Sequence, residues 1–206
     1  MSGNGYGGQV ATTTESAAPA SAERRGKPAP ARRLLDTATT LFARHGIRAI
    51  GIDRILAESG VARASLYSSY GSKDALVIAY LEHLDHRDRA RWNEATAAIA
   101  DPAARILTFF DLALASAPDR GFRGCQYANA ATEFPDEALA PVVAHRRWML
   151  DALTELLEAR RAPDAAGLAR RIQLIYDGAL AGSKLEHTVE PLHLGRALAA
   201  GLIPPA

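Results

Sequence analysis

The sequence predicts an all-α fold of about nine helices, and three observations support this prediction. Apolar residues recur at the three- and four-residue spacing of a helical face through most of the chain. No stretch of useful length shows the apolar–polar alternation of a β-strand. Five prolines fall at or near the expected helix boundaries, where this residue is tolerated: Pro102, Pro118, Pro135, Pro163 and Pro191.

Composition limits the class of protein. The chain has 206 residues, and 48% of them are hydrophobic, which is enough to bury a core. A single cysteine, Cys125, excludes a disulfide within the chain and a cysteine-rich zinc site. The sequence contains neither an apolar run of about 18 residues nor the apolar stretch of a secretory signal. We therefore expect a cytoplasmic protein that does not enter the membrane.

Positive charge is concentrated near the N-terminus. Residues 1–28 are rich in Gly, Ala, Ser, Thr and Pro without periodicity, which predicts a disordered tail. Between Glu23 and Lys73 there are ten Arg or Lys against four Asp or Glu, whereas the chain from Asp74 onward has 14 against 18. This asymmetry predicts a polyanion-binding end attached to a body with another task. The alternative is a solvated surface on a small domain.

Three short helices are expected first. The apolar face from Leu34 to Phe42 marks the first helix, and Gly46 is expected to end it as a left-handed cap. A second helix covers about 52–59, and Gly60 supplies a tight turn. A third follows over about 63–70, where Leu66 is the expected buried anchor.

Six further helices are expected after this region. Ser72 is a plausible N-cap for a long helix that reaches Trp92 or beyond. The remaining helical segments cover about 102–117, 125–134, 137–160, 165–185 and 190–202.

The second and third helices, joined through Gly60, have the form of a helix-turn-helix, whose second helix enters the DNA major groove. Arg63 can bond to guanine, Ser65 can contact a base edge, and Ala64 can touch a thymine methyl. Tyr67, Ser68, Ser69 and Lys73 suit phosphate contacts. The expected DNA-binding residues are Arg54, Arg63, Ala64, Ser65, Tyr67, Ser68, Ser69 and Lys73.

The stretch "GVARASLYSSYGSKDAL" resembles the TetR family of transcriptional regulators, and the resemblance covers about 32–80. Seven positions match the family pattern outright: Gly60, Val61, Leu66, Tyr67, Ser72, Lys73 and Leu76. Three positions depart from it. Gly51 replaces a capping Thr or Ser, Leu56 replaces a small Ala, and Ser69 replaces a frequent His or Tyr.

The resemblance implies a homodimeric repressor that releases a palindromic operator in double-stranded DNA when a small-molecule effector binds. It implies a DNA-binding domain over 29–73 and an effector-binding and dimerisation domain over 74–206. We expect the last two helices, about 165–202, to form a four-helix dimer interface, although they could instead pack inside one subunit. Candidate effector contacts are Phe109, Phe110, Cys125, Asn129, Glu133, Trp148 and Tyr176.

Two other interpretations remain open at this point. Cys125, or His83 with His86, could serve a helical enzyme or a metal protein, but no Gly-rich phosphate loop or HExxH motif is present. Alternatively, the body could be a protein-interaction module without a pocket. We expect no enzymatic activity, no catalytic or metal-binding residues and no cofactor, and the sequence leaves open whether Cys125 senses redox state.

Overall fold

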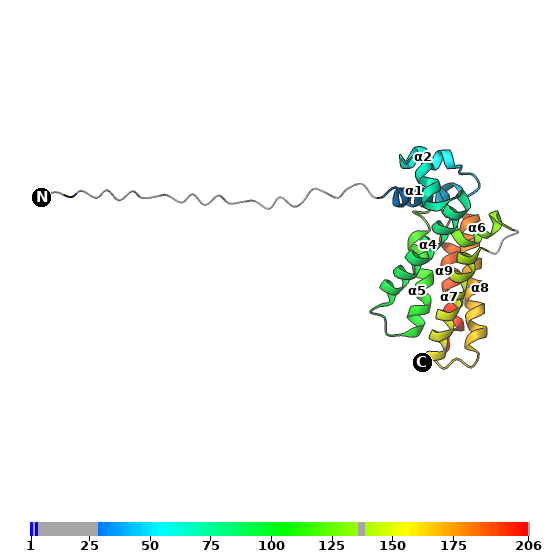
Figure 1. The fold of residues 1–206 in the computed structure, drawn as a ribbon. Coiled ribbons are helices and arrows are strands. Elements are labelled where there is room, and N and C mark those ends of the chain that lie inside the picture. The colour runs from blue at the N-terminus through cyan, green and yellow to red at the C-terminus, as the bar shows by residue number, and fades with distance from the viewer. Residues whose placement is uncertain (2, 4–28, 136–138, 206) are drawn as a thin grey trace.

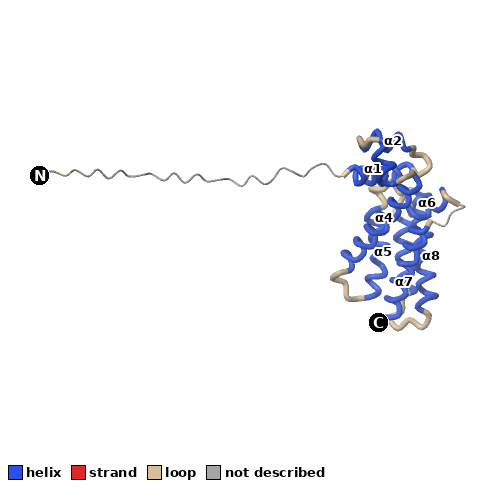
Figure 2. Tube along the Cα trace, in the orientation of Figure 1, coloured by secondary structure: helices blue, strands red, loops and turns tan. Residues whose placement is uncertain are grey.

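A computed structural model describes residues 1, 3, 29–135 and 139–205, and within these ranges it contains nine α-helices and no strand (Figures 1 and 2). The all-α prediction is confirmed. The predicted tail lies almost entirely outside the described residues. The helices are α1 (Pro30–His45), α2 (Ile52–Ser59), α3 (Arg63–Tyr70), α4 (Lys73–Thr96), α5 (Pro102–Ser116), α6 (Gln126–Glu133), α7 (Ala140–Ala159), α8 (Ala165–Glu186) and α9 (Glu190–Leu202).

Helices α1, α2 and α3 form a small bundle at one end of the molecule, at the start of α4 (Figure 1). Leu34, Ile55 and Leu66, one from each helix, are fully buried in its core. The same core continues into the first half of α4, where Tyr80 packs edge-on against Phe42 with ring centroids 5.3 Å apart. The N-terminal bundle is therefore anchored on α4 by shared apolar packing.

Turn geometry at the ends of these helices follows the expectations in two of three places. Gly60 adopts the left-handed conformation (φ 62°, ψ 31°), and the Ser72 side chain accepts a hydrogen bond from the Ala75 N–H. The left-handed cap expected at Gly46 is wrong, because its φ of 89° is paired with a ψ of 159°. This region is open essentially to glycine alone. A Cβ atom on Gly46 would lie 3.1 Å from a carboxylate oxygen of Glu133.

The larger body consists of α4 to α9, and α7 packs against α4, α5, α6 and α8 (Figure 1). Its main core contains Phe110, Leu153, Leu157 and Ile172. We expected α7 to begin near 137. The helix begins at Ala140, and residues 136–138 lie outside the described part of the chain.

Helices α8 and α9 lie against each other, and small residues allow their close approach. A Cβ on Gly195 would come within 2.7 Å of the Ala179 Cβ, and one on Gly182 within 2.9 Å of Pro191. The small side chains of α8 and α9 thus serve a contact within one subunit. The outward face of the two helices carries four exposed leucines: Leu174, Leu185, Leu194 and Leu198.

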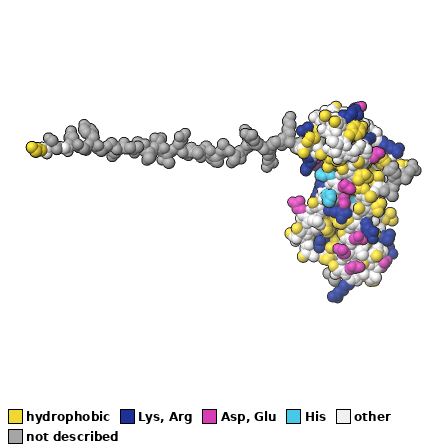
Figure 3. Space-filling view, viewed as in Figure 1, with side chains coloured by type: hydrophobic (Ala, Val, Ile, Leu, Met, Phe, Trp, Pro, Cys, Tyr) yellow, Lys and Arg dark blue, Asp and Glu magenta, His cyan; other side chains and the backbone are white. Residues whose placement is uncertain are grey.

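None of the described helices is both long enough and apolar enough to span a membrane. Histidines, cations and carboxylates lie side by side on the face of the body next to the N-terminal bundle (Figure 3).

Candidate functional site

Helix α3 presents a polar surface to solvent and buries only its apolar side. Leu66 is fully buried and Val61 is 7% exposed, whereas Ala64, Ser68 and Ser69 are exposed. This arrangement follows from the sequence, since the only large aliphatic residue in the helix is Leu66. The outer face is small enough to enter a major groove and offers hydroxyls and a guanidinium for hydrogen bonding.

The arginines expected at the DNA each carry a carboxylate partner. Arg63 pairs with Asp53 of α2, which raises the pKa of Arg63 above its usual value, mainly through the Asp53 charge. Arg54 pairs with Glu58 at 2.9 Å. These pairs lie at the surface, where an ion pair is weak and exchangeable.

The other residues expected to contact DNA differ in their exposure and in their hydrogen-bond partners. Tyr67 is 47% exposed and lies close enough to Arg63 to contribute to the raised pKa of that guanidinium. Ser68 donates to the Ser65 carbonyl at 3.2 Å. Lys73 donates to the Ile47 carbonyl at 3.0 Å, so its ammonium also supports the loop between α1 and α2.

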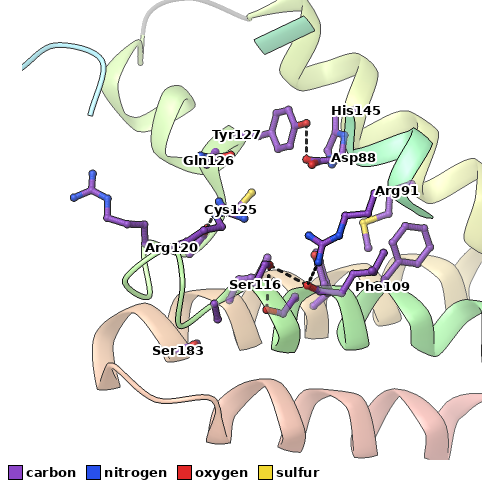
Figure 4. A pocket seen from close by; sticks show the side chains of 18 of the residues that line it. Asp88, Arg91, Phe109, Ser116, Arg120, Cys125, Gln126, Tyr127, His145 and Ser183 are labelled. Carbon is purple, nitrogen blue, oxygen red and sulfur yellow. Dashed lines mark hydrogen bonds between the residues drawn. The ribbon is translucent and has the colours of Figure 1, made fainter. Parts of the chain in front are cut away.

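A cavity of about 100 Å³ lies in the body, among α4, α5, the α5–α6 loop, α6, α7 and α8 (Figure 4). An aromatic cluster forms one wall. Trp92 stacks on Phe109 with centroids 5.1 Å apart, and Trp148 lies edge-on to both at 6.0 and 5.7 Å. A site that is mainly apolar with a few polar groups is typical of small-molecule binding.

Hydrogen-bonded polar side chains form another wall (Figure 4). The Tyr127 hydroxyl donates to Asp88 at 3.0 Å, and the Tyr127 ring stacks on His145 at 3.8 Å. His145 Nδ1 lies 2.9 Å from the Asp85 carboxylate, which also accepts from Arg89 at 2.8 Å. Burial lowers the pKa of His145 against the opposing effect of the Asp85 hydrogen bond, which favours the neutral imidazole at neutral pH.

Three arginines also line the cavity, and two of them donate to backbone carbonyl oxygens. Arg91 donates to the Leu112 carbonyl at 3.4 Å, and Arg120 donates to the Gly124 carbonyl at 3.2 Å. The Arg123 Nε is buried without a hydrogen-bond partner. Sequence reasoning missed all three, together with Asp88, Tyr127 and His145. The only available signal was the pair of arginines in "RGFRGC", directly before Cys125.

The structure brings together four of the seven residues expected at the effector. Phe109, Cys125, Trp148 and Tyr176 line the cavity. Three others lie elsewhere: Phe110 is buried in the core against Tyr176, Asn129 bonds to Lys184 and to the Arg123 carbonyl, and Glu133 faces the N-terminal bundle.

Glu133 forms the clearest polar link between the two parts of the molecule. Its carboxylate accepts hydrogen bonds from the backbone N–H groups of Ile47 at 3.0 Å and Arg48 at 2.5 Å. Both donors belong to the loop that connects α1 to α2. Because Cys125 caps the other end of α6 and Tyr127 lies in its first turn, this short helix connects the cavity to the N-terminal bundle.

Cys125 acts structurally at the start of α6. Its sulfur accepts a hydrogen bond from the Ala128 N–H at 3.4 Å, and burial raises the pKa of the thiol. A raised pKa disfavours the reactive thiolate. Among the described residues, no group of three His, Cys, Asp or Glu side chains is placed to hold a metal ion.

Comparison with known proteins gives a consistent result. Residues 34–80 match the family model described as bacterial regulatory proteins, tetR family. A TetR-family transcriptional regulator from Streptomyces coelicolor, known from a crystal structure, is 35% identical, with a TM-score of 0.76 over 84% of this chain and 96% of that one. The transcriptional regulator AcuR of Cereibacter sphaeroides is 27% identical over 82% of this chain and 86% of its own length.

Other matches are partial or show the fold alone. An HTH-type transcriptional regulator of Mycobacterium tuberculosis is 33% identical, but the match spans only 36% of this chain and 37% of that protein. The reduced form of Escherichia coli NemR has a TM-score of 0.75 over 85% of this chain and 98% of that one at 22% identity, and therefore shares the fold.

Proposed function

Because this chain belongs to the TetR family of transcriptional regulators, we propose that it is a homodimeric repressor that releases a palindromic operator when a small molecule occupies the cavity. Residues 29–73 form the proposed DNA-binding domain, and 74–206 form the proposed effector-binding and dimerisation domain. The observation that carries this proposal is the exposed polar face of α3, held on a buried Leu66 and turned outward at Gly60.

In the proposed DNA complex, each of the expected DNA-binding residues has its own contact. Arg63 exchanges its Asp53 partner for guanine O6 and N7, and Ser65 contacts a base edge beside it. Ala64 is exposed and offers a methyl group to thymine. The expected phosphate contacts come from Arg54, Tyr67, Ser68, Ser69 and Lys73.

The outward leucines of α8 and α9 support dimerisation. Leu174, Leu185, Leu194 and Leu198 are between 53% and 81% exposed in the single chain, and their association with a second copy would remove this apolar surface from water. In the proposed dimer, two copies of α3 enter successive major grooves about 34–36 Å apart. Two-fold symmetry of the protein then requires a palindromic operator.

Two helices support coupling between the cavity and the DNA. Helix α4 carries Tyr80 in the core of the N-terminal bundle and Arg91 at the cavity. Helix α6 carries Tyr127 at the cavity and Glu133 at the α1–α2 loop. A ligand that favours a different position of either helix changes the distance between the two recognition helices. The resulting loss of operator affinity is limited by how much more tightly the ligand binds the altered conformation than the original one.

The proposal is tested by selecting bound genomic fragments and measuring affinity for the best palindrome at several salt concentrations. Affinity should fall as salt rises, because phosphate contacts release counterions. Arg63→Ala should lose about ten- to hundred-fold in affinity and become indifferent to one base position. Arg147→Ala, which removes an exposed arginine of α7, is the matched control and should bind like the parent.

Two outcomes would contradict this account. The first is a protein that stays monomeric and does not prefer any duplex. The second is an Arg63→Ala variant with unchanged affinity and selectivity, which would remove the base-reading role assigned to Arg63.

A further inference from the structure

We propose that the cavity takes a small amphipathic organic anion, in which a carboxylate is attached to a compact apolar body. This inference rests on the proposed function, because it names the chemical class of the effector. It depends on three features: cavity arginines without an ion pair in the described part of the chain, a carboxylate that is already engaged, and indole rings that already contact arginines from outside the cavity lining.

The cavity cations have no carboxylate partner among the described residues. Arg91, Arg120 and Arg123 line the cavity, yet none of them takes part in an ion pair in that part of the chain. Figure 4 shows Arg91 reaching toward Ser116, and both side chains bond to the Leu112 carbonyl. Arg91 is exposed, whereas Arg120 and Arg123 are half-buried. Guanidinium groups that line a cavity without an ion pair in the described part of the chain favour an anionic ligand, since charge-assisted hydrogen bonds are stronger than neutral ones.

The charge of Arg120 acts on the cavity interior. Burial is the main cause that raises the pKa of both Cys125 and Tyr176; the charge of Asp177 adds to the rise in each case, and the charge of Arg120 opposes it. The Arg120 guanidinium is therefore close enough to act on groups that line the cavity, alongside the carboxylates of the surrounding helices.

The acidic group of the cavity is already occupied. Asp88 accepts the Tyr127 hydroxyl at 3.0 Å and pairs with Arg87 at 3.4 Å. His145 adds no positive charge when neutral, and burial lowers its pKa. The net charge presented by the lining is thus positive, which disfavours a cationic ligand.

The aromatic wall offers apolar contact instead of a cation site. A cation could in principle bind over an indole face. However, the Arg89 guanidinium already lies 5.0 Å from the Trp148 ring centroid, and the Arg105 guanidinium lies 5.3 Å from that of Trp92. Phe109 completes a surface that suits a short alkyl chain or a single ring, and the volume of about 100 Å³ keeps that body compact.

The test is a calorimetric titration of the full chain with matched ligands. The probes are sodium acetate, butyrate, hexanoate, benzoate and phenylacetate, the primary amide of each acid, and the amines hexylamine and benzylamine. We expect at least one carboxylate to bind, and its amide to bind about ten- to hundred-fold more weakly. Both tryptophans line the cavity, so their fluorescence gives an independent readout of binding near the aromatic wall, and the arginine variants below identify the site.

Variants identify the charged groups that are responsible. Arg91→Gln and Arg120→Gln should each weaken carboxylate binding about ten-fold, and Arg91→Lys should restore part of the loss. Ser116→Asp places a carboxylate next to Arg91 and should abolish binding of the anion, whereas Ser116→Asn should retain it. Arg147→Gln, outside this cavity, is the control and should bind like the parent.

Three results would overturn the proposal: an amide or amine that binds as tightly as the matched acid, unchanged carboxylate affinity in Ser116→Asp, or no carboxylate binding at all. Operator binding without added ligand is measured on the same preparation. A parent that binds a palindrome but no carboxylate would refute the effector class and leave the regulator intact. The opposite result would refute the DNA-binding function and leave the anion site.

Discussion

Arginines of the N-terminal bundle and arginines of the cavity are placed in opposite ways. Arg54 and Arg63 each pair with a carboxylate at the exposed surface, whereas Arg91 and Arg120 line a cavity and donate to backbone carbonyls, with no ion pair to any described residue. An exposed ion pair holds a guanidinium in place at little cost and is easily exchanged for phosphate or a base. A guanidinium that lines a cavity and has no ion pair in the described part of the chain instead favours a ligand that brings a negative charge. The same side chain thus suits two kinds of anion.

The first prediction concerns subunit number, because the proposed recognition of a palindrome needs two copies of α3, whereas the cavity is formed within one chain. Leu185→Glu with Leu194→Glu places charges on the outward face of α8 and α9, where both leucines are exposed. We expect loss of the dimer and a fall of about hundred-fold or more in affinity for the palindrome, measured by sedimentation and fluorescence anisotropy.

Carboxylate binding by each subunit should survive in this double variant. Val143→Glu, which changes an exposed valine of α7, is the matched control and should remain dimeric. A double variant that stays dimeric would show that the interface lies elsewhere.

The next largest effect is expected from breaking the hydrogen bonds between Glu133 and the α1–α2 loop. Glu133→Gln removes the charge from the carboxylate that accepts from the Ile47 and Arg48 N–H groups. We expect the free energy of unfolding, measured by urea denaturation, to fall by about 1–3 kcal/mol. The control is Glu158→Gln, at an exposed position of α7. Equal stability of both variants would mean that the link contributes nothing.

Removal of the carboxylate that pairs with Arg63 should have a smaller effect, and it should raise operator affinity instead of lowering it. Asp53→Asn frees Arg63 from its carboxylate and removes a negative charge near the DNA phosphates. Operator affinity should therefore rise by about two- to five-fold at low salt, and the gain should shrink as salt increases. Asp36→Asn, which breaks the Arg32 pair on α1, serves for comparison. Lower affinity in Asp53→Asn would indicate that the pair orders Arg63 for binding.

The pH dependence of stability gives the smallest expected effect, and it concerns the polar wall of the cavity. Burial holds the pKa of His145 below its usual value in the folded chain. The unfolded chain therefore binds more protons at this residue, so stability should decrease as the pH falls from about 7 through the ordinary histidine pKa near 6.5. His145→Gln should flatten the urea-derived profile between about pH 7 and 5. A profile identical to that of the parent would argue against the lowered pKa.

Protonation of Asp85 does not affect stability between about pH 7 and 5. Burial alone would raise the pKa of Asp85, but hydrogen bonds from Arg89 and His145 outweigh it, and the pKa is lowered overall. Its contribution to stability is therefore present above the ordinary aspartate pKa of about 4 and is lost only at more acidic pH.

Local pattern predicted the N-terminal bundle well, because its determinants are close in sequence. The bounds of α2 and α3, the turn at Gly60 and the cap at Ser72 all agree with the structure. Each depends on steric or hydrogen-bonding preferences within a few residues. Gly46 is the exception, since its conformation is linked to Glu133, far away along the chain.

The cavity could be predicted only in part, because its members come from distant helices. The four-residue spacing of Cys125, Asn129 and Glu133 does place them along one side of α6. However, that side meets the cavity at its start and the α1–α2 loop at its end, so the same face has different neighbours along its length. Arg91 and His145 belong to no spacing pattern, and only the packing of α4 against α7 brings them to one cavity.

The central claim is that occupancy of the cavity by an anion and occupancy of the DNA-reading surface are coupled in one dimer. The direct measurement is operator affinity with and without a saturating concentration of the carboxylate found by calorimetry. We predict a loss of about ten-fold or more, which corresponds to a coupling of about 1.4 kcal/mol, and no loss with the matched amide. Equal affinity in the presence and absence of the bound carboxylate would contradict the claim.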